Sequence, residues 1–197
     1  MMRLLLLRHG AVAAGGVAYG RRVDPPLSDE GRDEASRLAD RLHLDDRSGP
    51  VHVVRSPTQR TQETATLAGL SVDAVEDGWI ERDLGDWEGR PWEELWAEAP
   101  DAIQTDPEAF AAFTPPGGEP FTRLRERIVD ALTRLVHDRD GEGTAVVVCH
   151  GGPITHAVGH VLELSPAVAL RLRVGTATVT ELRAWGDDRF TLERFSG

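Results

Sequence analysis

Short apolar runs along the chain predict buried β-strands. Residues 3–8, 51–54 and 144–149 are largely continuous apolar runs that end in polar or turn-forming residues. Such runs are typical of strands that are buried on both faces of a parallel sheet. A further short run predicts another strand at residues 72–75.

Helical periodicity occupies the stretches between these runs. Apolar residues recur there three and four positions apart, which places them on one face of a helix. The predicted helices cover residues 28–42, 58–70 and 121–137, and a fourth follows His150-Gly151-Gly152-Pro153 as far as about residue 162. Alternating strands and helices predict an α/β fold, a three-layer αβα sandwich with a mostly parallel sheet and helices on both faces. The length of 197 residues fits a single domain over residues 1–197.

The carboxyl-terminal part of the chain predicts two further strands. Residues 170–185 and 190–195 have strand character, and Gly186-Asp187-Asp188 between them predicts a hairpin turn. This strand pair offers a sheet edge through which a homodimer can form.

Residues 76–119 differ in composition from the rest of the chain. They contain several prolines, short helical patterns and most of the tryptophans. We expect this segment to be a cap, or lid, inserted over a site. Its tryptophans Trp79, Trp92 and Trp96 are expected to serve packing, whereas Trp87 is a candidate for substrate contact because it lies near Glu81 in the sequence.

The charge of the chain limits its partners. The formal net charge is -11, which disfavours attraction to nucleic acid or to an anionic membrane surface. All 22 basic residues are arginine, so a phosphate site must be built from guanidinium groups, histidines and backbone amides. Cys149 is the only cysteine, and the apolar start is too short for a signal peptide, which together favour a cytoplasmic protein.

Three predicted strands end in polar residues that carry chemistry. These endings are Arg8-His9-Gly10, Arg55-Ser56-Pro57 and His150-Gly151. The carboxyl ends of parallel strands meet at one edge of a sheet, where ligands of α/β proteins bind. We therefore expect these residues to form one site.

These residue types are suited to the hydrolysis of a phosphate ester. Arg8 and Arg55 can clamp phosphate oxygens, and a neutral His9 imidazole can attack phosphorus. His150, if charged, can stabilise the transition state, with Gly151 beside it as a further phosphate-binding residue. Glu81 is the candidate proton donor. No metal or other cofactor is expected, because the guanidinium groups neutralise the phosphoryl charge.

Several blocks in order along the chain carry a resemblance to a known family. The blocks are Leu7-Arg8-His9-Gly10; Asp24 with Leu27, Ser28 and Gly31; Ser56-Pro57-x-x-Arg60-Thr61-x-x-Thr64-Ala65; Glu81 to Gly89; Pro116-Gly117-Gly118-Glu119; and Val147 to Gly152. They resemble the histidine phosphatase superfamily, also called the phosphoglycerate mutase-like family. The resemblance implies that His9 is the nucleophile, that Arg8, Arg55 and His150 form the phosphate pocket, and that Glu81 donates a proton.

The chain departs from the family pattern beside the nucleophile. Many relatives have Glu and Thr or Ser after the His-Gly pair and Asn a few residues later, whereas this chain has Ala11, Val12 and Gly15. The loop at residues 16–21 is similar to that of alpha-ribazole phosphatases, so Tyr19, Gly20 and Arg21 are candidate substrate contacts, although solvation of Arg21 is an equal alternative.

Three functions agree with these residues. The leading hypothesis is a phosphomonoesterase that acts on a small phosphorylated metabolite through a phosphohistidine. A phosphoglycerate mutase-like phosphotransferase is the first alternative, which the short chain disfavours, and a non-catalytic phosphate-binding member is the second. His156 and His160 have the spacing of zinc ligands on a helix, but no third ligand is evident, so packing roles are favoured.

Overall fold

A single twisted sheet forms the centre of the computed structural model, which describes residues 1–42, 44, 50–186 and 189–197. Its strand order is β3-β2-β4-β1-β5-β6. The strands are β1 (Met2–Arg8), β2 (Val51–Arg55), β3 (Ala74–Val75), β4 (Gly143–Cys149), β5 (Val179–Trp185) and β6 (Arg189–Arg194). Every pair up to β1 is parallel, and β5 runs antiparallel to both neighbours. The predicted, mostly parallel sheet is confirmed.

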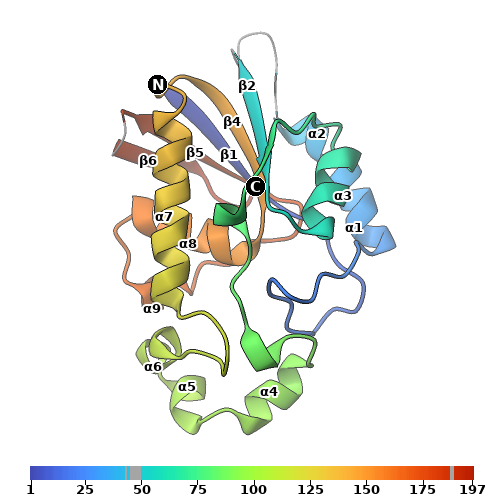
Figure 1. The fold of residues 1–197 in the computed structure, drawn as a ribbon, viewed down its shortest axis with the longest axis vertical. Coiled ribbons are helices and arrows are strands. Elements are labelled where there is room, and N and C mark those ends of the chain that lie inside the picture. Colours follow the sequence, from blue (N-terminus) through green and yellow to red (C-terminus); the bar gives the residue numbers. More distant parts are fainter. Residues whose placement is uncertain (43, 45–49, 187–188) are drawn as a thin grey trace.

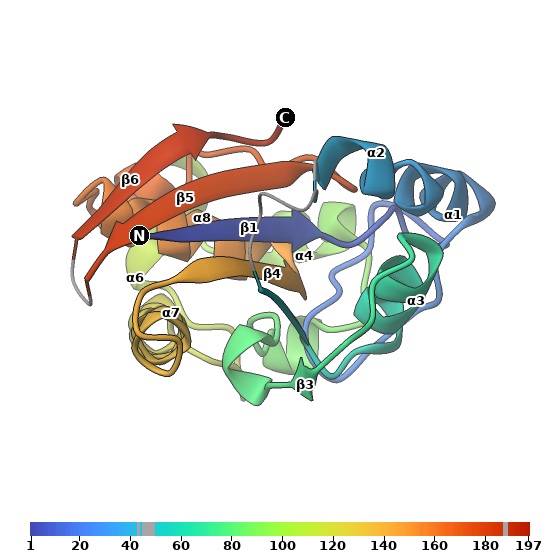
Figure 2. The same cartoon turned by 90° about the horizontal axis from the view of Figure 1, so that it is seen from above.

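Helices cover both faces of this sheet, as Figures 1 and 2 show. One face packs against α7 (Phe121–His137) and α8 (Gly151–Val161). The other packs against α2 (Leu38–Leu42) and α3 (Gln59–Leu67), with α1 (Asp29–Ser36) beside them. Side chains along a strand alternate between faces, so Leu4 and Leu6 of β1 join the first core while Leu5 and Leu7 join the second. The αβα sandwich predicted from the sequence is therefore confirmed.

The helices η3 (Gly85–Trp87), α4 (Trp92–Glu98), α5 (Asp101–Thr105) and α6 (Pro107–Ala112) lie at one end of the molecule (Figure 1). The first short helix of the same segment, η2 (Asp77–Trp79), instead packs against α7. We call residues 76–119 the cap. Trp87, Leu95 and Ile103 form a small apolar cluster here, against which Trp92 and Trp96 pack. Trp79 differs, because it is fully buried in the core beside α7.

Two predicted elements have different limits in the structure. The strand expected over 170–185 begins only at Val179, because Ser165 caps the short helix α9 (Pro166–Ala169) and a loop follows it. The helix expected over 28–42 is interrupted at Arg37, which separates α1 from α2. The strands of the predicted hairpin pair antiparallel, but Asp187 and Asp188 of its turn lie outside the described residues. Among the described helices, none has the length and apolar character needed to cross a membrane.

Candidate active site

A cavity of about 600 Å³ lies where the end of β1 and the start of α8 meet the cap. Its lining combines charged residues with apolar residues of the cap and of the loop that follows β1. The titratable members are Arg8, His9, Arg60, Glu81, Arg82 and Arg173. The carboxyl ends of β1, β2 and β4 are neighbours in the sheet, as the strand-end residues predicted.

His9 lies in the cavity wall directly after β1 and is only 7% exposed. Its Nδ1 lies 2.8 Å from the carbonyl oxygen of Gly10. A carbonyl can only accept a hydrogen bond, so we assign the proton to Nδ1 and the lone pair to Nε2. Burial and the positive charge of Arg60 lower the pKa of His9 to about 3, so its imidazole is neutral near pH 7. This is the form that can act as a nucleophile.

The loop that carries His9 is fixed by the helix that follows it. Ser28 caps α1 by accepting a hydrogen bond from Gly31 N at 3.0 Å, and its own amide donates to the carbonyl of Ala11 at 2.9 Å. A Cβ at Gly31 would lie 1.9 Å from the oxygen of Ala11, so only glycine allows this close approach. The Leu-Ser-x-x-Gly block of the sequence therefore holds the loop that carries His9.

Two arginines reach the cavity near His9. Arg8 Nη1 donates to the carbonyl of Val174, while its buried Nε has no hydrogen-bond partner in the described part of the chain. Arg60 lies in the first turn of α3, is 1% exposed, and forms an ion pair with Asp24 at 2.8 Å. Its Nη2 also donates to Gly20 O at 2.7 Å. These contacts fix the two guanidinium groups in an arrangement suited to a phosphate.

The structure does not bring Arg55 to this cavity, so the expectation that it lines the phosphate site is corrected. Arg55 lies on the same face of β2 as Val53, the face that packs against α3. Its guanidinium donates to Ser56 O at 2.8 Å and approaches Gln62 on the exposed side of α3. Arg60 provides the second guanidinium instead.

His150 lies behind the cavity wall, where it is fully buried. Its ring centroid is 5.2 Å from that of His9. Its Nε2 contacts Ser56 Oγ at 2.8 Å, and Arg60 Nε donates to its Nδ1 at 3.3 Å. Burial and the nearby arginines lower its pKa, so the ring is neutral, unlike the charged form considered from the sequence. In this arrangement His150 contacts the guanidinium of Arg60 and the ring of His9.

Glu81 reaches the cavity from the cap side. Its Oε2 accepts a hydrogen bond from Gly152 N at 3.1 Å, in the first turn of α8. A Cβ at Gly152 would lie 2.1 Å from Glu81 Oε1, whereas a Cβ at Gly151 would meet Arg8 at an ordinary 3.6 Å. Gly151 also lines the cavity, as expected. The Gly-Gly pair thus allows a carboxylate to lie beside the positive end of a helix.

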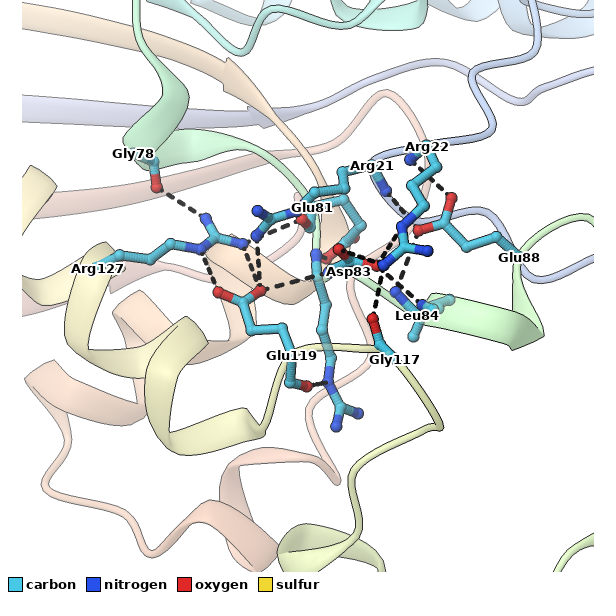
Figure 3. A network of polar contacts seen from close by, with 12 residues as sticks. Arg21, Arg22, Gly78, Glu81, Asp83, Leu84, Glu88, Gly117, Glu119 and Arg127 are labelled. Carbon is cyan, nitrogen blue, oxygen red and sulfur yellow. Dashed lines mark hydrogen bonds and ion pairs between the residues drawn. The ribbon is translucent and has the colours of Figure 1, made fainter.

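A network of partly buried charges fixes the backbone around Glu81 (Figure 3). Arg127 donates to Glu81 O at 3.0 Å and to Gly78 O at 3.0 Å. Glu119, 8% exposed, accepts from both Arg127 and Arg21 at 2.9 Å. The three ionised side chains connect α7, the end of the cap and the loop after β1, so Glu81 has a defined position.

The other predicted substrate contacts have mixed placements. Tyr19 and Trp87 line the cavity, so both remain candidate substrate contacts. Gly20 is not among the residues that line it, and its carbonyl accepts a hydrogen bond from Arg60. Arg21 does not line the cavity, because its guanidinium is paired with Glu119. The residues that depart from the family pattern, Ala11, Val12 and Gly15, all line the cavity.

His156 and His160 do not form part of a recognisable metal site. His156 is buried against the ring of Phe121, and His160 packs near Phe190. Over residues 1–42, 44, 50–186 and 189–197, no group of three His, Cys, Asp or Glu side chains has a suitable arrangement for a metal ion.

Sequence reasoning missed Arg60, Gly152 and Arg173 as cavity residues. Arg60 was visible inside the Ser-Pro-x-x-Arg block, where it falls in the first turn of the predicted helix. Gly152 was visible as the second glycine after His150. Arg173 carries no sequence signal, because it lies in a loop that has no motif.

The family model, the relatives and the solved structures that match this chain agree on one family. The model of the histidine phosphatase superfamily (branch 1) matches residues 4–196. The chain is 32% identical to the bifunctional protein Rv2228c of Mycobacterium tuberculosis over 94% of its own length and 51% of that protein. It is 28% identical to a metal-independent phosphoserine phosphatase of Arabidopsis thaliana, covering 98% of this chain and 80% of the relative. The structure of a mycobacterial glucosyl-3-phosphoglycerate phosphatase superposes with a TM-score of 0.82 at 28% identity, covering 99% and 98% of the two chains.

The chain spans about half the length of the first of these relatives. Features of that whole protein therefore do not transfer directly to this chain.

Proposed function

This chain belongs to the histidine phosphatase superfamily (branch 1), and from that premise we propose that it hydrolyses phosphate monoesters through a phosphohistidine on His9. Relatives named as phosphatases support hydrolase chemistry in general. The observation that carries the proposal is the 2.8 Å contact between His9 Nδ1 and the carbonyl oxygen of Gly10, from which the tautomer is assigned. Nδ1 of His9 is held by Gly10 O, which leaves the Nε2 lone pair in a cavity that also contains Arg8 and Arg60.

The first step transfers the phosphoryl group to the protein. His9 Nε2 attacks phosphorus, the ester P–O bond breaks, and its electron pair leaves with the alcohol oxygen. Glu81, in its protonated form, gives that oxygen a proton. Arg8, Arg60 and the Gly151 amide at the start of α8 stabilise the phosphoryl oxygens, and His150 orients Arg60 and His9.

The second step releases phosphate. The Glu81 carboxylate removes a proton from water, the water oxygen attacks phosphorus, and the N–P bond breaks with its electron pair returning to His9 Nε2. Glu81 is protonated again at the end, so each turnover restores the starting state. No step in this sequence requires a metal ion.

Release of inorganic phosphate from a panel of phosphate monoesters tests this function. We expect turnover in the presence of EDTA and inhibition by vanadate, which mimics a pentacoordinate phosphorus. The phosphotransferase alternative predicts an isomerised product that depends on a bisphosphate primer. The non-catalytic alternative predicts binding of the esters without phosphate release. Either outcome would refute hydrolysis as the activity.

Replacing Gly152 with alanine is expected to displace Glu81, because the new Cβ would lie 2.1 Å from Glu81 Oε1. For phenyl phosphate, whose leaving oxygen needs a proton, we expect kcat/KM, which reports the first phosphoryl transfer, to fall about 10- to 100-fold. For para-nitrophenyl phosphate, which leaves as a stable anion, the loss in the first step should be smaller.

The kcat/KM values for the two esters measure this difference, because hydrolysis of the phosphoenzyme, which is common to both, does not enter them. Gly151→Ala is the matched control, since its Cβ would make only an ordinary contact with Arg8. An equal loss for both esters in Gly152→Ala would argue against a proton-donor role for Glu81.

A further inference from the structure

Beyond the phosphate-binding end, the cavity is walled mainly by apolar side chains. Leu84, Trp87 and Trp92 line it from the cap, and Phe121 and Leu124 line it from α7. Trp87 is held against Trp92 by an edge contact with ring centroids 6.1 Å apart. Such walls favour an apolar or aromatic body in the ligand.

Most charged groups of the lining are already engaged. Arg82 donates to Glu119 O at 2.7 Å and to Phe113 O at 2.8 Å, and its guanidinium lies 3.5 Å from the centre of the Phe121 ring. Glu81 is the only carboxylate among the described residues that line the cavity, and it is bonded to the start of α8. The wall therefore offers no further acidic side chain to a ligand that carries an ammonium group.

Arg173 is different from these groups. It is exposed, it lines the same cavity, and it has no hydrogen bond or ion pair to any described residue. A free guanidinium at this place creates a local positive charge in a protein whose net charge is -11. It can therefore attract an anionic group of a ligand at the cavity while the rest of the surface repels it.

The loop that carries Arg173 is attached directly to the phosphate-binding end. The carbonyl of the next residue, Val174, accepts from Arg8 Nη1, and Ala177 N donates to His9 O at 3.1 Å. Thr176 is also bonded to Glu34 of α1 at 3.0 Å. These bonds fix the backbone of the loop relative to His9. Arg173 can therefore select substrates by the distance between their phosphate and a second anionic group.

We propose that Arg173 is a specificity-determining residue that binds a second anionic group of the substrate. This inference rests on the proposed phosphatase function. The preferred substrate is then a phosphate monoester with an apolar or aromatic body and a distal carboxylate or phosphate. Phosphoserine fits poorly, because its ammonium group meets apolar walls and arginines.

The test compares aryl phosphates with and without a distal carboxylate. The probes are phenyl phosphate and its derivatives with a para carboxylate, attached directly or through a short alkyl arm, together with phosphoserine. Wild type, Arg173→Gln and Arg171→Gln are measured. Arg171 is the matched control, because it is exposed on the same loop but lines a different cavity.

In wild type, we expect at least one carboxylated ester to exceed both phenyl phosphate and phosphoserine in kcat/KM. Arg173→Gln should lower kcat/KM for that ester by about 5- to 10-fold, mainly through KM, as loss of a partly exposed charge-assisted hydrogen bond implies. Phenyl phosphate should be unaffected, and Arg171→Gln should change neither.

Equal effects of Arg173→Gln on charged and uncharged esters would overturn the inference, as would phosphoserine being the best substrate. If wild type hydrolyses none of the esters, the proposed phosphatase function itself fails. Normal hydrolysis of phenyl phosphate without an Arg173-dependent preference refutes only the role of Arg173.

Discussion

His9→Ala is expected to lower kcat for phosphate ester hydrolysis by at least about 10³-fold, because it removes the atom that accepts the phosphoryl group. The buried imidazole of His9 is neutral, with its Nδ1 proton bonded to Gly10 O. The neighbouring histidine, His150, cannot replace it as the phosphoryl acceptor. His150 is fully buried and its nitrogens are bonded to Ser56 and Arg60.

Initial rates with para-nitrophenyl phosphate measure this loss, and thermal unfolding shows whether the variant is folded. His160→Ala is the matched control, since His160 lies on α8 but does not line the cavity of His9. A folded His9→Ala protein that retains wild-type turnover would refute nucleophilic catalysis by this residue.

Arg60→Gln is expected to have the second largest effect, about 10²- to 10³-fold on kcat/KM, because it removes a preorganised positive charge from the phosphate-binding end. The same change also removes the ion pair with Asp24 and the hydrogen bond to His150. Loss of these buried contacts should lower the free energy of unfolding as well.

Arg55→Gln separates the structural assignment from the expectation based on sequence. Arg55 contacts Ser56 O and lies outside the cavity, so we expect kcat/KM for an aryl phosphate to change by no more than a few-fold. Arg60→Lys helps to distinguish chemistry from folding, because it retains the charge but not the paired donors. If Arg55→Gln were the more damaging variant, the assignment of Arg60 would be wrong.

The fold was largely predictable because the central strands β1, β2 and β4 are mostly apolar runs. The chain order of strands and helices then restricts the topology to a mostly parallel sheet. The loop before Val179 was not predictable, since Leu170 and Leu172 pack against the core without forming a strand. The spacing of apolar residues indicates which side chains are buried, but these two leucines pack against the core from a loop and not from a strand.

The site was predictable where chemistry follows directly from a strand end, as for Arg8 and His9. It was not predictable where the role of a residue depends on the orientation of its side chain. Arg55 ends a strand as Arg8 does, but its side chain turns toward α3. Arg60, in the first turn of α3, contacts Asp24 and His150 instead. Such directions depend on packing between elements that are distant in sequence.

Arg21 illustrates the same limit for charged loops. The sequence allows either a substrate contact or a solvated side chain for it, and the structure has neither. Its guanidinium pairs with Glu119, which is 98 residues away along the chain. A partner at that distance cannot be inferred from local pattern.

The central claim, a phosphoryl group carried by His9, is tested most directly by trapping it in Glu81→Gln with para-nitrophenyl phosphate. This ester needs no proton for its leaving group, so His9 should be phosphorylated, while hydrolysis of the N–P bond slows without the carboxylate base. We predict a burst of para-nitrophenolate equal to the enzyme concentration, and a base-stable, acid-labile phosphoryl group on the peptide that contains His9. Linear release without a burst or label, or a phosphoryl group on another residue, would contradict the account.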